Sequence, residues 1–154
     1  MTSMIRRRRR GAGSDRGAEL IELAVVLPIL LVVFAALIDF GFLFQRYEVI
    51  TNAAREGARI GVLPTYTQTD VQNRVSQYLT ASGLNAAAAT ITVTYPTLAL
   101  PSGSTVGVVD VLVQYPSQYV VLGPIAGLVG GSGWTTINLR AGSNMRVEAP
   151  GAGS

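Results

Sequence analysis

The side chains that could perform chemistry are few in this sequence, which contains no cysteine, no histidine and no lysine. Without histidine the chain lacks the commonest general base and metal ligand. Without cysteine it has neither a disulfide nor a thiolate nucleophile. The absence of lysine removes Schiff-base chemistry and the phosphate-binding lysine of Walker-type loops. Most classes of enzyme are therefore excluded before any motif is considered.

The carboxylates of the C-terminal part, Asp70, Asp110 and Glu148, have ordinary structural explanations. They stand in the first turn of a predicted helix, on the polar face of a predicted strand and near the chain end. The spacing places no two of them as an acid/base pair. The glycine-rich segment 127–133 lacks the lysine of a phosphate loop. We therefore expect a protein without catalytic activity, and without a bound metal or cofactor.

Two further carboxylates, Glu22 and Asp39, lie in a long apolar run. The 16 residues 23–38 carry no charge, and the 25 residues 20–44 are mostly apolar. A membrane-spanning helix needs about 20 such residues. The alternative is a buried core helix, but a small remaining domain would hardly surround a helix that is apolar on all sides. The pattern thus predicts one membrane span at about residues 20–44.

Arginines precede this span, and they indicate its orientation. Residues 1–17 hold six arginines against one aspartate, whereas residues 18–154 hold six arginines against eight carboxylates. By the positive-inside rule, residues 1–17 form a cytoplasmic basic leader and the chain from about residue 45 lies outside. Nucleic-acid binding is a less economical explanation beside an apolar span, so no nucleic-acid partner is predicted. The topology-determining arginines are Arg6, Arg7, Arg8, Arg9 and Arg10.

The boundary between the leader and the helix resembles a type IV-like prepilin cleavage site. Gly17 stands at this boundary, Glu22 follows five residues later, and only apolar residues come next. A membrane aspartyl peptidase cuts such precursors after the glycine, on the cytoplasmic side. Ala18 would then carry a new α-amino group, charged at neutral pH. In pilin-like filaments a glutamate at this position faces the amine of a neighbouring subunit, which would set the packing register.

Three other interpretations remain for this region. Glu22 could simply lie at the level of the lipid headgroups. The apolar run could be a secretory or twin-arginine signal, although no A-x-A cleavage site follows Ile38. The chain could also be a bitopic membrane protein that is never cleaved, which shares every feature except the use of Gly17.

The helical pattern continues beyond the membrane, and we expect one long helix over residues 18–62. No helix breaker occurs before Pro64. Glu56 and Arg59 can pair at i, i+3. Small residues recur at i, i+4 and i+8, which lets another backbone approach closely. This helix-packing stripe consists of Ala53, Gly57 and Gly61.

Residues 63–150 are expected to form a small extracytoplasmic α+β module, followed by a disordered tail at 151–154. Thr69 and Gln72 fit a capping box that starts an amphipathic helix, and Gly83 suits its C′ position. Residues 119–129 are apolar but too short for a second crossing, so they should form a loop with a short helix. The apolar face of the amphipathic helix holds Val71, Val75, Tyr78 and Leu79. About three antiparallel strands are expected, at 90–95, 106–115 and 135–148.

Several of these motifs occur together in the order typical of one protein family. The chain resembles the N-terminal region of TadE-like proteins, minor pilin-like (pseudopilin) components of tight-adherence, or Flp, pilus systems. The resemblance is strong over residues 16–62 and weak over 134–148. The matching positions are Gly17, Ala18, Glu22, Leu27-Pro28, Asp39-Phe40-Gly41 and Ala54 to Arg59.

The resemblance implies a role in assembling an adhesive type IV-like pilus from a bacterial inner (cytoplasmic) membrane. The implied partners are a sister pseudopilin, the major Flp pilin, the prepilin peptidase and the inner-membrane pilus platform. The protein would act in a hetero-oligomer or a filament. Its fold would be pilin-like, with a long transmembrane helix that continues into the extracytoplasmic module.

Overall fold

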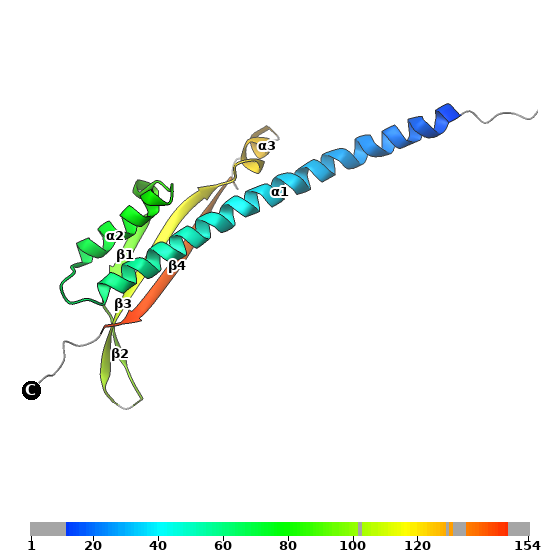
Figure 1. Cartoon of the computed structure of the whole chain (residues 1–154). Helices are drawn as coiled ribbons and strands as arrows, with labels where there is room; N and C mark the ends of the chain where they lie inside the picture. The colour runs from blue at the N-terminus through cyan, green and yellow to red at the C-terminus, as the bar shows by residue number, and fades with distance from the viewer. Residues whose placement is uncertain (1–11, 102, 129, 131–134, 148–154) are drawn as a thin grey trace, which may run out of the picture.

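A computed structural model describes residues 12–101, 103–128, 130 and 135–147 of the chain (Figure 1). The leader arginines, Arg6 to Arg10, and the predicted tail at 151–154 lie outside these described residues. One long helix runs from the N-terminal end into a small body of helices and strands at its other end. The expected α+β class, with a long apolar helix leading into an antiparallel module, is confirmed.

The long helix α1 extends over Ala12–Gly61, so it begins earlier than the predicted start at Ala18. No proline lies between Ala12 and Gly17, and an internal glycine costs a helix only about 1 kcal/mol relative to alanine. Nothing local therefore stops the helix at Gly17, and Gly17 lies inside it. Pro28 is also within α1.

The second helix, α2, covers Gln68–Ala81 and carries the predicted buried face. Its N-cap differs from the prediction, because the capping box is formed by Thr67 and Asp70 and not by Thr69 and Gln72. Both pairs have the i, i+3 spacing of a capping box. The aspartate at N3 can accept the N-cap amide in the same way as a glutamine, so the spacing alone does not distinguish the two pairs. Gly83 has φ +82° just after the helix, as predicted for a C′ glycine.

The strands form one antiparallel arrangement around β3 (Thr105–Gln118). The strand β1 (Thr90–Thr94) pairs with one side of β3, and β4 (Thr136–Arg146) pairs with the other. A short strand, β2 (Thr97–Ala99), pairs with the start of β3 and was not predicted. All three of its residues are exposed, so β2 lacks the alternating pattern that reveals a half-buried strand.

The C-terminal half of α1 and the helix α2 lie on the same face of the sheet (Figure 1). Their apolar sides meet the inward side chains of β1, β3 and β4 in one core. A single-turn 3₁₀ helix, η1 (Ala86–Ala88), leads into β1, and α3 (Leu122–Leu128) joins β3 to β4. The predicted short helix at 119–129 is therefore present. The core residues include Ile50, Ala53, Ala54, Ala58, Val71, Val75, Leu79, Val93, Val109, Val111 and Val113.

Candidate functional site

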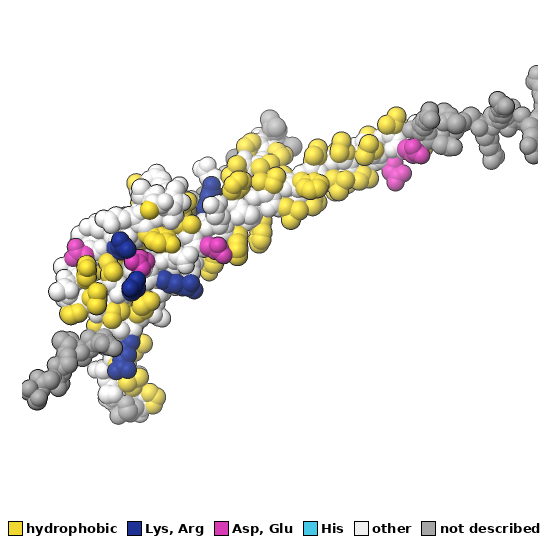
Figure 2. Space-filling view, viewed as in Figure 1, with side chains coloured by type: hydrophobic (Ala, Val, Ile, Leu, Met, Phe, Trp, Pro, Cys, Tyr) yellow, Lys and Arg dark blue, Asp and Glu magenta, His cyan; other side chains and the backbone are white. Residues whose placement is uncertain are grey.

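The N-terminal half of α1 carries exposed apolar side chains along its length, and Figure 2 shows one face of it. Only 6% of its most apolar 18-residue window is buried in the molecule. A core helix would be mostly buried, so this exposure argues against the core-helix alternative, although Ala35 and Asp39 of the same half are buried. The helix is long and apolar enough to cross a membrane once. Its exposed large side chains include Leu23, Ile29, Leu30, Val33, Phe34, Leu37 and Ile38.

The predicted processing and pairing residues lie together at the membrane-side end of α1. Gly17 and Ala18 are exposed, and a Cβ added to Gly17 would meet no atom within 4 Å. Glu19 and Glu22 are exposed as well and line a shallow groove. Within the described part of the chain, no hydrogen bond or ion pair engages the Glu22 carboxylate. This group is therefore available to a partner outside the chain.

Asp39, in contrast, is almost fully buried, with 1% of its surface exposed. The backbone N–H groups of Val120 and Val121 donate to its Oδ1 at 2.6 and 2.9 Å, and that of Leu122 donates to Oδ2 at 2.7 Å. These amides belong to the turn that leads into α3 and would otherwise lack partners, as do all first-turn amides of helices. Asp39 thus attaches the end of the apolar span to the C-terminal module.

Arg46 makes a second attachment, almost two turns further along α1. Its guanidinium donates to the Ser117 hydroxyl and, at 3.1 Å, to the carbonyl oxygen of Gln118. Ser117 is buried, and a buried hydroxyl needs a hydrogen-bond partner, which Arg46 supplies. Asp39 and Arg46 therefore form hydrogen bonds with the same chain segment, from the end of β3 to the start of α3.

The small-residue stripe lies in the interior of the body. A Cβ added to Gly57 would stand 2.5 Å from Val75 Cγ2 and 3.3 Å from Val111 Cγ1. A Cβ added to Gly61 would stand 2.8 Å from Val109 Cγ2, and Ala53 is fully buried. The stripe thus allows α2 and β3 of the same chain to approach α1, instead of offering a surface to a partner.

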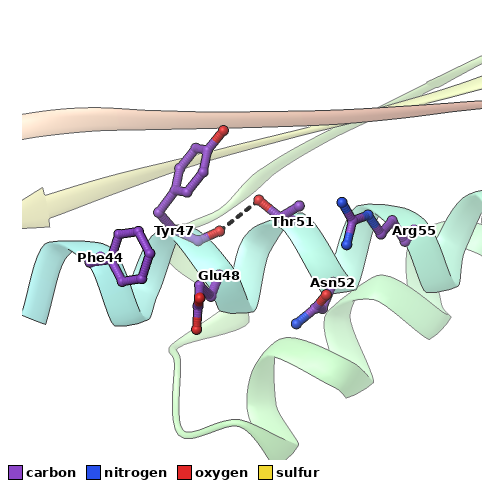
Figure 3. Close-up of a pocket in the computed structure, with 6 residues that line it drawn as sticks. All are labelled: Phe44, Tyr47, Glu48, Thr51, Asn52 and Arg55. Atoms are coloured by element: carbon purple, nitrogen blue, oxygen red, sulfur yellow. Dashed lines mark hydrogen bonds between the residues drawn. The ribbon is translucent and has the colours of Figure 1, made fainter.

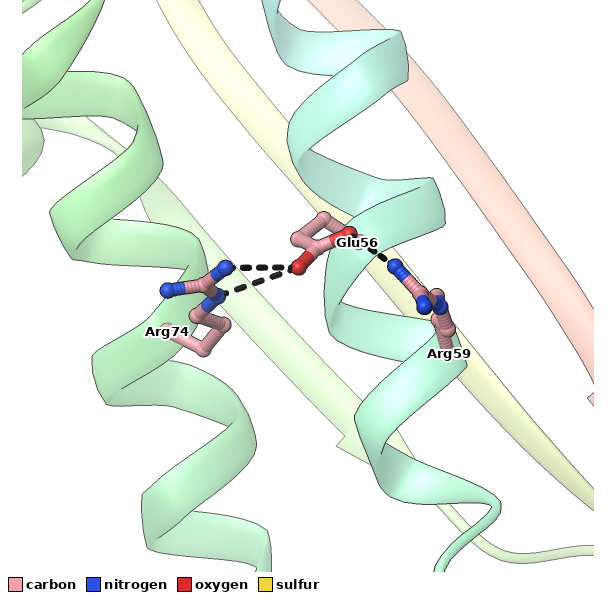
Figure 4. A network of polar contacts seen from close by, with 3 residues as sticks. All are labelled: Glu56, Arg59 and Arg74. Atoms are coloured by element: carbon pink, nitrogen blue, oxygen red, sulfur yellow. Dashed lines mark hydrogen bonds and ion pairs between the residues drawn. The ribbon is translucent and has the colours of Figure 1, made fainter.

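Glu56 of α1 links this helix to α2 on the surface of the body (Figure 4). Its Oε1 accepts two hydrogen bonds from Arg74, from Nε at 3.2 Å and from NH2 at 2.7 Å. The predicted i, i+3 pair with Arg59 is also present, at 3.8 Å, but the Arg59 side chain is mostly exposed. The partner in α2 is the closer one, and sequence spacing within one helix gave no sign of it.

A shallow groove runs along α1 where the helix leaves its apolar part (Figure 3). Within it, the Thr51 hydroxyl donates to the carbonyl oxygen of Tyr47 at 2.8 Å, a bond internal to the helix. Glu48 and Arg55 lie on different turns of the helix in this view and make no ion pair that we observe with each other. The lining residues are Phe44, Tyr47, Glu48, Thr51, Asn52 and Arg55. Among the described residues, no group of three or more acidic side chains could hold a metal ion.

Comparison with known proteins gives a match where the motifs are densest. Residues 17–59 match the family model described as TadE-like protein. The predicted resemblance is confirmed over these 43 of the 154 residues. No curated protein and no solved structure matches the chain.

The TadE-like segment coincides with most of α1. It begins at Gly17 and includes Glu22, Asp39 and Glu56. It ends at Arg59, just before α1 itself ends at Gly61. The weaker resemblance predicted over 134–148 lies outside the matched residues. Both the exposed apolar half of the helix and its packed half therefore belong to the TadE-like segment.

Sequence reasoning missed the partners of three residues in this segment: Asp39, Arg46 and Glu56. A carboxylate at the end of an apolar span was a signal that Asp39 has a buried partner. Arg46 and Glu56 carried no such signal, because charged residues outside a membrane are ordinary surface residues. Their partners, Ser117 and Arg74, come from distant positions that only the tertiary fold brings close.

Proposed function

We propose that this chain is a minor pilin-like component in the assembly of a tight-adherence (Flp) type IV-like pilus, without catalytic activity. The TadE-like match over residues 17–59 is the observation that carries the proposal, since it supports a component associated with Tad pili. The protein sits in the inner membrane with α1 as its single span, its N-terminus in the cytoplasm and its body outside.

We further propose that prepilin peptidase cuts the chain between Gly17 and Ala18. Both residues are exposed in the structure and no other described part of the chain packs over them, which leaves the bond sterically open. The bond is held in helical conformation, so the peptidase must unwind the first turns of α1. Residues 17–20 are exposed, and isolated helix ends fray readily.

After cleavage, the amine of Ala18 and the carboxylate of Glu22 belong to the membrane-embedded end of the protein. A carboxylate in hydrocarbon is costly unless it is paired. Glu22 has the exposure needed for a partner from a second chain. A sister pseudopilin or the major Flp pilin would supply this partner within the assembling pilus, on the inner-membrane platform.

The test of processing is the mass of the protein taken from its native membrane. We expect a mature chain that starts at Ala18, and N-terminal sequencing should read Ala-Glu-Leu-Ile-Glu. A strain without prepilin peptidase should yield the full-length chain and serves as the control. Recovery of only the full-length form from the normal strain would favour the second candidate, an uncleaved bitopic protein that acts as a docking or assembly factor.

A further inference from the structure

The short helix α3 and the turn before it form an apolar element beside the membrane span. Residues 119–128 contain no charged side chain. Val120 is 48% exposed and Ile125 is 42% exposed, although both are large and apolar. Many other large apolar side chains of the body face the common core, although some, such as Leu63 and Leu98, are exposed to a similar degree. We call residues 119–128 the α3 segment.

The α3 segment packs against the apolar half of α1 and stands apart from the core of the body. Ala35 of α1 and Ala126 of α3 are both buried, at 5% and 4% exposure, and the two helices are in contact. The side chains of α1 around Ala35, such as Phe34 and Ile38, remain exposed. The apolar surface of the α3 segment therefore continues the apolar surface of the span.

The depth of this contact follows from the length of α1. From Leu20 to Asp39 the helix advances about 28 Å at 1.5 Å per residue. The hydrocarbon core of a bilayer is about 30 Å thick. A span that begins near Leu20 therefore brings Asp39 to the outer boundary of the hydrocarbon, and Ala35 lies one turn deeper.

The backbone of the α3 segment is suited to this depth. Irregular backbone next to lipid is tolerated only where its polar groups have partners. The N–H groups of Val120, Val121 and Leu122 all donate to Asp39. The carboxylate in turn receives three donors and is shielded from the surroundings. The Asp39 carboxylate and the three amides thus satisfy one another, and the exposed side chains of the α3 segment that remain, such as Val120 and Ile125, are apolar.

We propose that the α3 segment inserts into the outer leaflet of the membrane, at the boundary between headgroups and acyl chains. Interfacial amphipathic helices bury their apolar face about 5–10 Å into this boundary. The lipid contact would hold the body at a fixed height and tilt relative to the bilayer. This proposal rests on α1 as a membrane span, but it does not depend on cleavage after Gly17.

The absence of cysteine makes a direct test possible, because each introduced cysteine is unique. The full chain carrying Ile125→Cys is labelled with an environment-sensitive fluorophore and reconstituted into phosphatidylcholine vesicles. Val33→Cys, in the middle of the span, reports on insertion of α1. Gln77→Cys, exposed on α2, reports on a water-facing position. Val120→Cys provides a second reporter in the α3 segment.

We expect lipids that carry a nitroxide near the headgroup to remove most of the fluorescence at positions 125 and 120, while aqueous iodide has little effect there. Iodide should quench position 77 and lipid nitroxides should not. If iodide quenches positions 125 and 120 as it does 77 while position 33 responds to lipid, α1 spans the membrane but the α3 proposal is wrong. Shielding of position 125 from both quenchers would also overturn it, in favour of cover by the chain itself or by a second copy of it. A position 33 open to iodide would overturn both the span and the α3 proposal.

Discussion

At the scale of single residues, the two carboxylates of the apolar span have opposite surroundings. Asp39 is buried and accepts three backbone hydrogen bonds, so its charge is compensated within the chain. Glu22 is exposed and engages no described residue. A charge in the membrane needs a partner, since desolvation without one is costly. The partner of Asp39 is intramolecular, whereas the described residues supply none for Glu22, for which we have proposed a partner from another chain.

Replacement of Glu22 distinguishes pairing with another chain from a position at the level of the headgroups. If Glu22 pairs with the Ala18 amine of a neighbour, Glu22→Gln should impair incorporation into the pilus more than membrane insertion, because the amide carries no charge. Membrane fractionation measures insertion, and the content of sheared pili measures incorporation. Glu19→Gln is the matched control, since Glu19 is equally exposed one turn away. Equal loss of insertion and incorporation would favour the headgroup position.

Removal of the Asp39 carboxylate should release the α3 segment without unfolding the body. Asp39→Ala leaves three backbone N–H groups without acceptors, and a buried unsatisfied group costs about 1–3 kcal/mol. We expect faster hydrogen exchange at the amides of Val120, Val121 and Leu122, and little change in β3. Asp110→Ala, at an exposed aspartate of β3, is the control. Unchanged exchange at these three amides would show that Asp39 does not hold the turn.

At the scale of elements, α1 serves two environments with one continuous helix. Its first half is apolar and exposed, whereas its second half buries small residues and Ile50 against α2 and the sheet. Small side chains are needed there because α2 and β3 approach the helix axis closely. One continuous helix thereby joins the apolar half of α1 to the body.

The close approach at Gly57 predicts that alanine destabilises the protein at Gly57 but not at Gly41. Gly57→Ala places a methyl group against Val75, whose β-branched side chain cannot easily turn away. Overpacking costs about 1–3 kcal/mol, and better helix propensity offsets about 1 kcal/mol of it. We expect a net loss of up to about 2 kcal/mol, measured by denaturant unfolding of the body in detergent. Gly41→Ala, where nothing lies within 4 Å, should cost nothing.

The capping box of α2 predicts a dependence of stability on pH. The Thr67 hydroxyl and backbone N–H both donate to the Asp70 carboxylate, at 2.7 and 2.9 Å, and they lower the pKa of Asp70. A carboxyl whose pKa is lower in the folded state adds stability above its unfolded pKa of about 3.9. That stability is lost as the pH falls through the lower, folded pKa.

Asp70→Ala should therefore lower the melting temperature at neutral pH and approach the wild type in strongly acidic solution. Thermal unfolding of both proteins across the acidic range measures this difference. Asp110→Ala again serves as the control, since Asp110 is an exposed carboxylate of β3 without a capping role. A difference that stays constant down to the lowest pH would contradict the assigned role of Asp70.

At the scale of the whole molecule, charge and apolar surface are separated along one axis. In the sequence, Arg6 to Arg10 come first. The exposed apolar half of α1 follows, and the body carries side chains of both charges (Figure 2). The body holds six arginines against eight carboxylates when it is counted with α1 from residue 18. This arrangement suits a chain that crosses a membrane once, with the leader retained on the cytoplasmic side.

Neutralisation of the leader should therefore disturb orientation. With Arg6 to Arg10 replaced by glutamine, we expect a smaller fraction of chains with the body outside, because the positive charge no longer holds the N-terminus in the cytoplasm. A cysteine at Gln77, labelled by a membrane-impermeant maleimide on spheroplasts, measures this fraction. Arg55→Gln with Arg59→Gln removes positive charge from the other side of the span and should not reduce labelling. Unchanged labelling of the leader variant would mean that the body alone directs translocation.

The sequence by itself determined the class and order of the elements. An uncharged run of the right length predicts the exposed helix, because lipid-facing surfaces must be apolar on all sides. Alternating residues such as Val109, Val111 and Val113 predict a strand with one buried face. The motifs from Gly17 to Arg59 predict the TadE-like match. All of these are local patterns, which can be recognised from the sequence alone.

Only the tertiary structure decided which distant residues meet. It places Ser117 beside Arg46, Arg74 beside Glu56 and the amides of 120–122 on Asp39, across long stretches of chain. It also turns the Ala53-Gly57-Gly61 stripe inward, toward α2 and β3. Local spacing cannot specify such contacts, because they depend on how the helix and the sheet pack in space. For the same reason, the sequence signals that Asp39 needs a buried partner, but only the fold identifies that partner as the turn before α3.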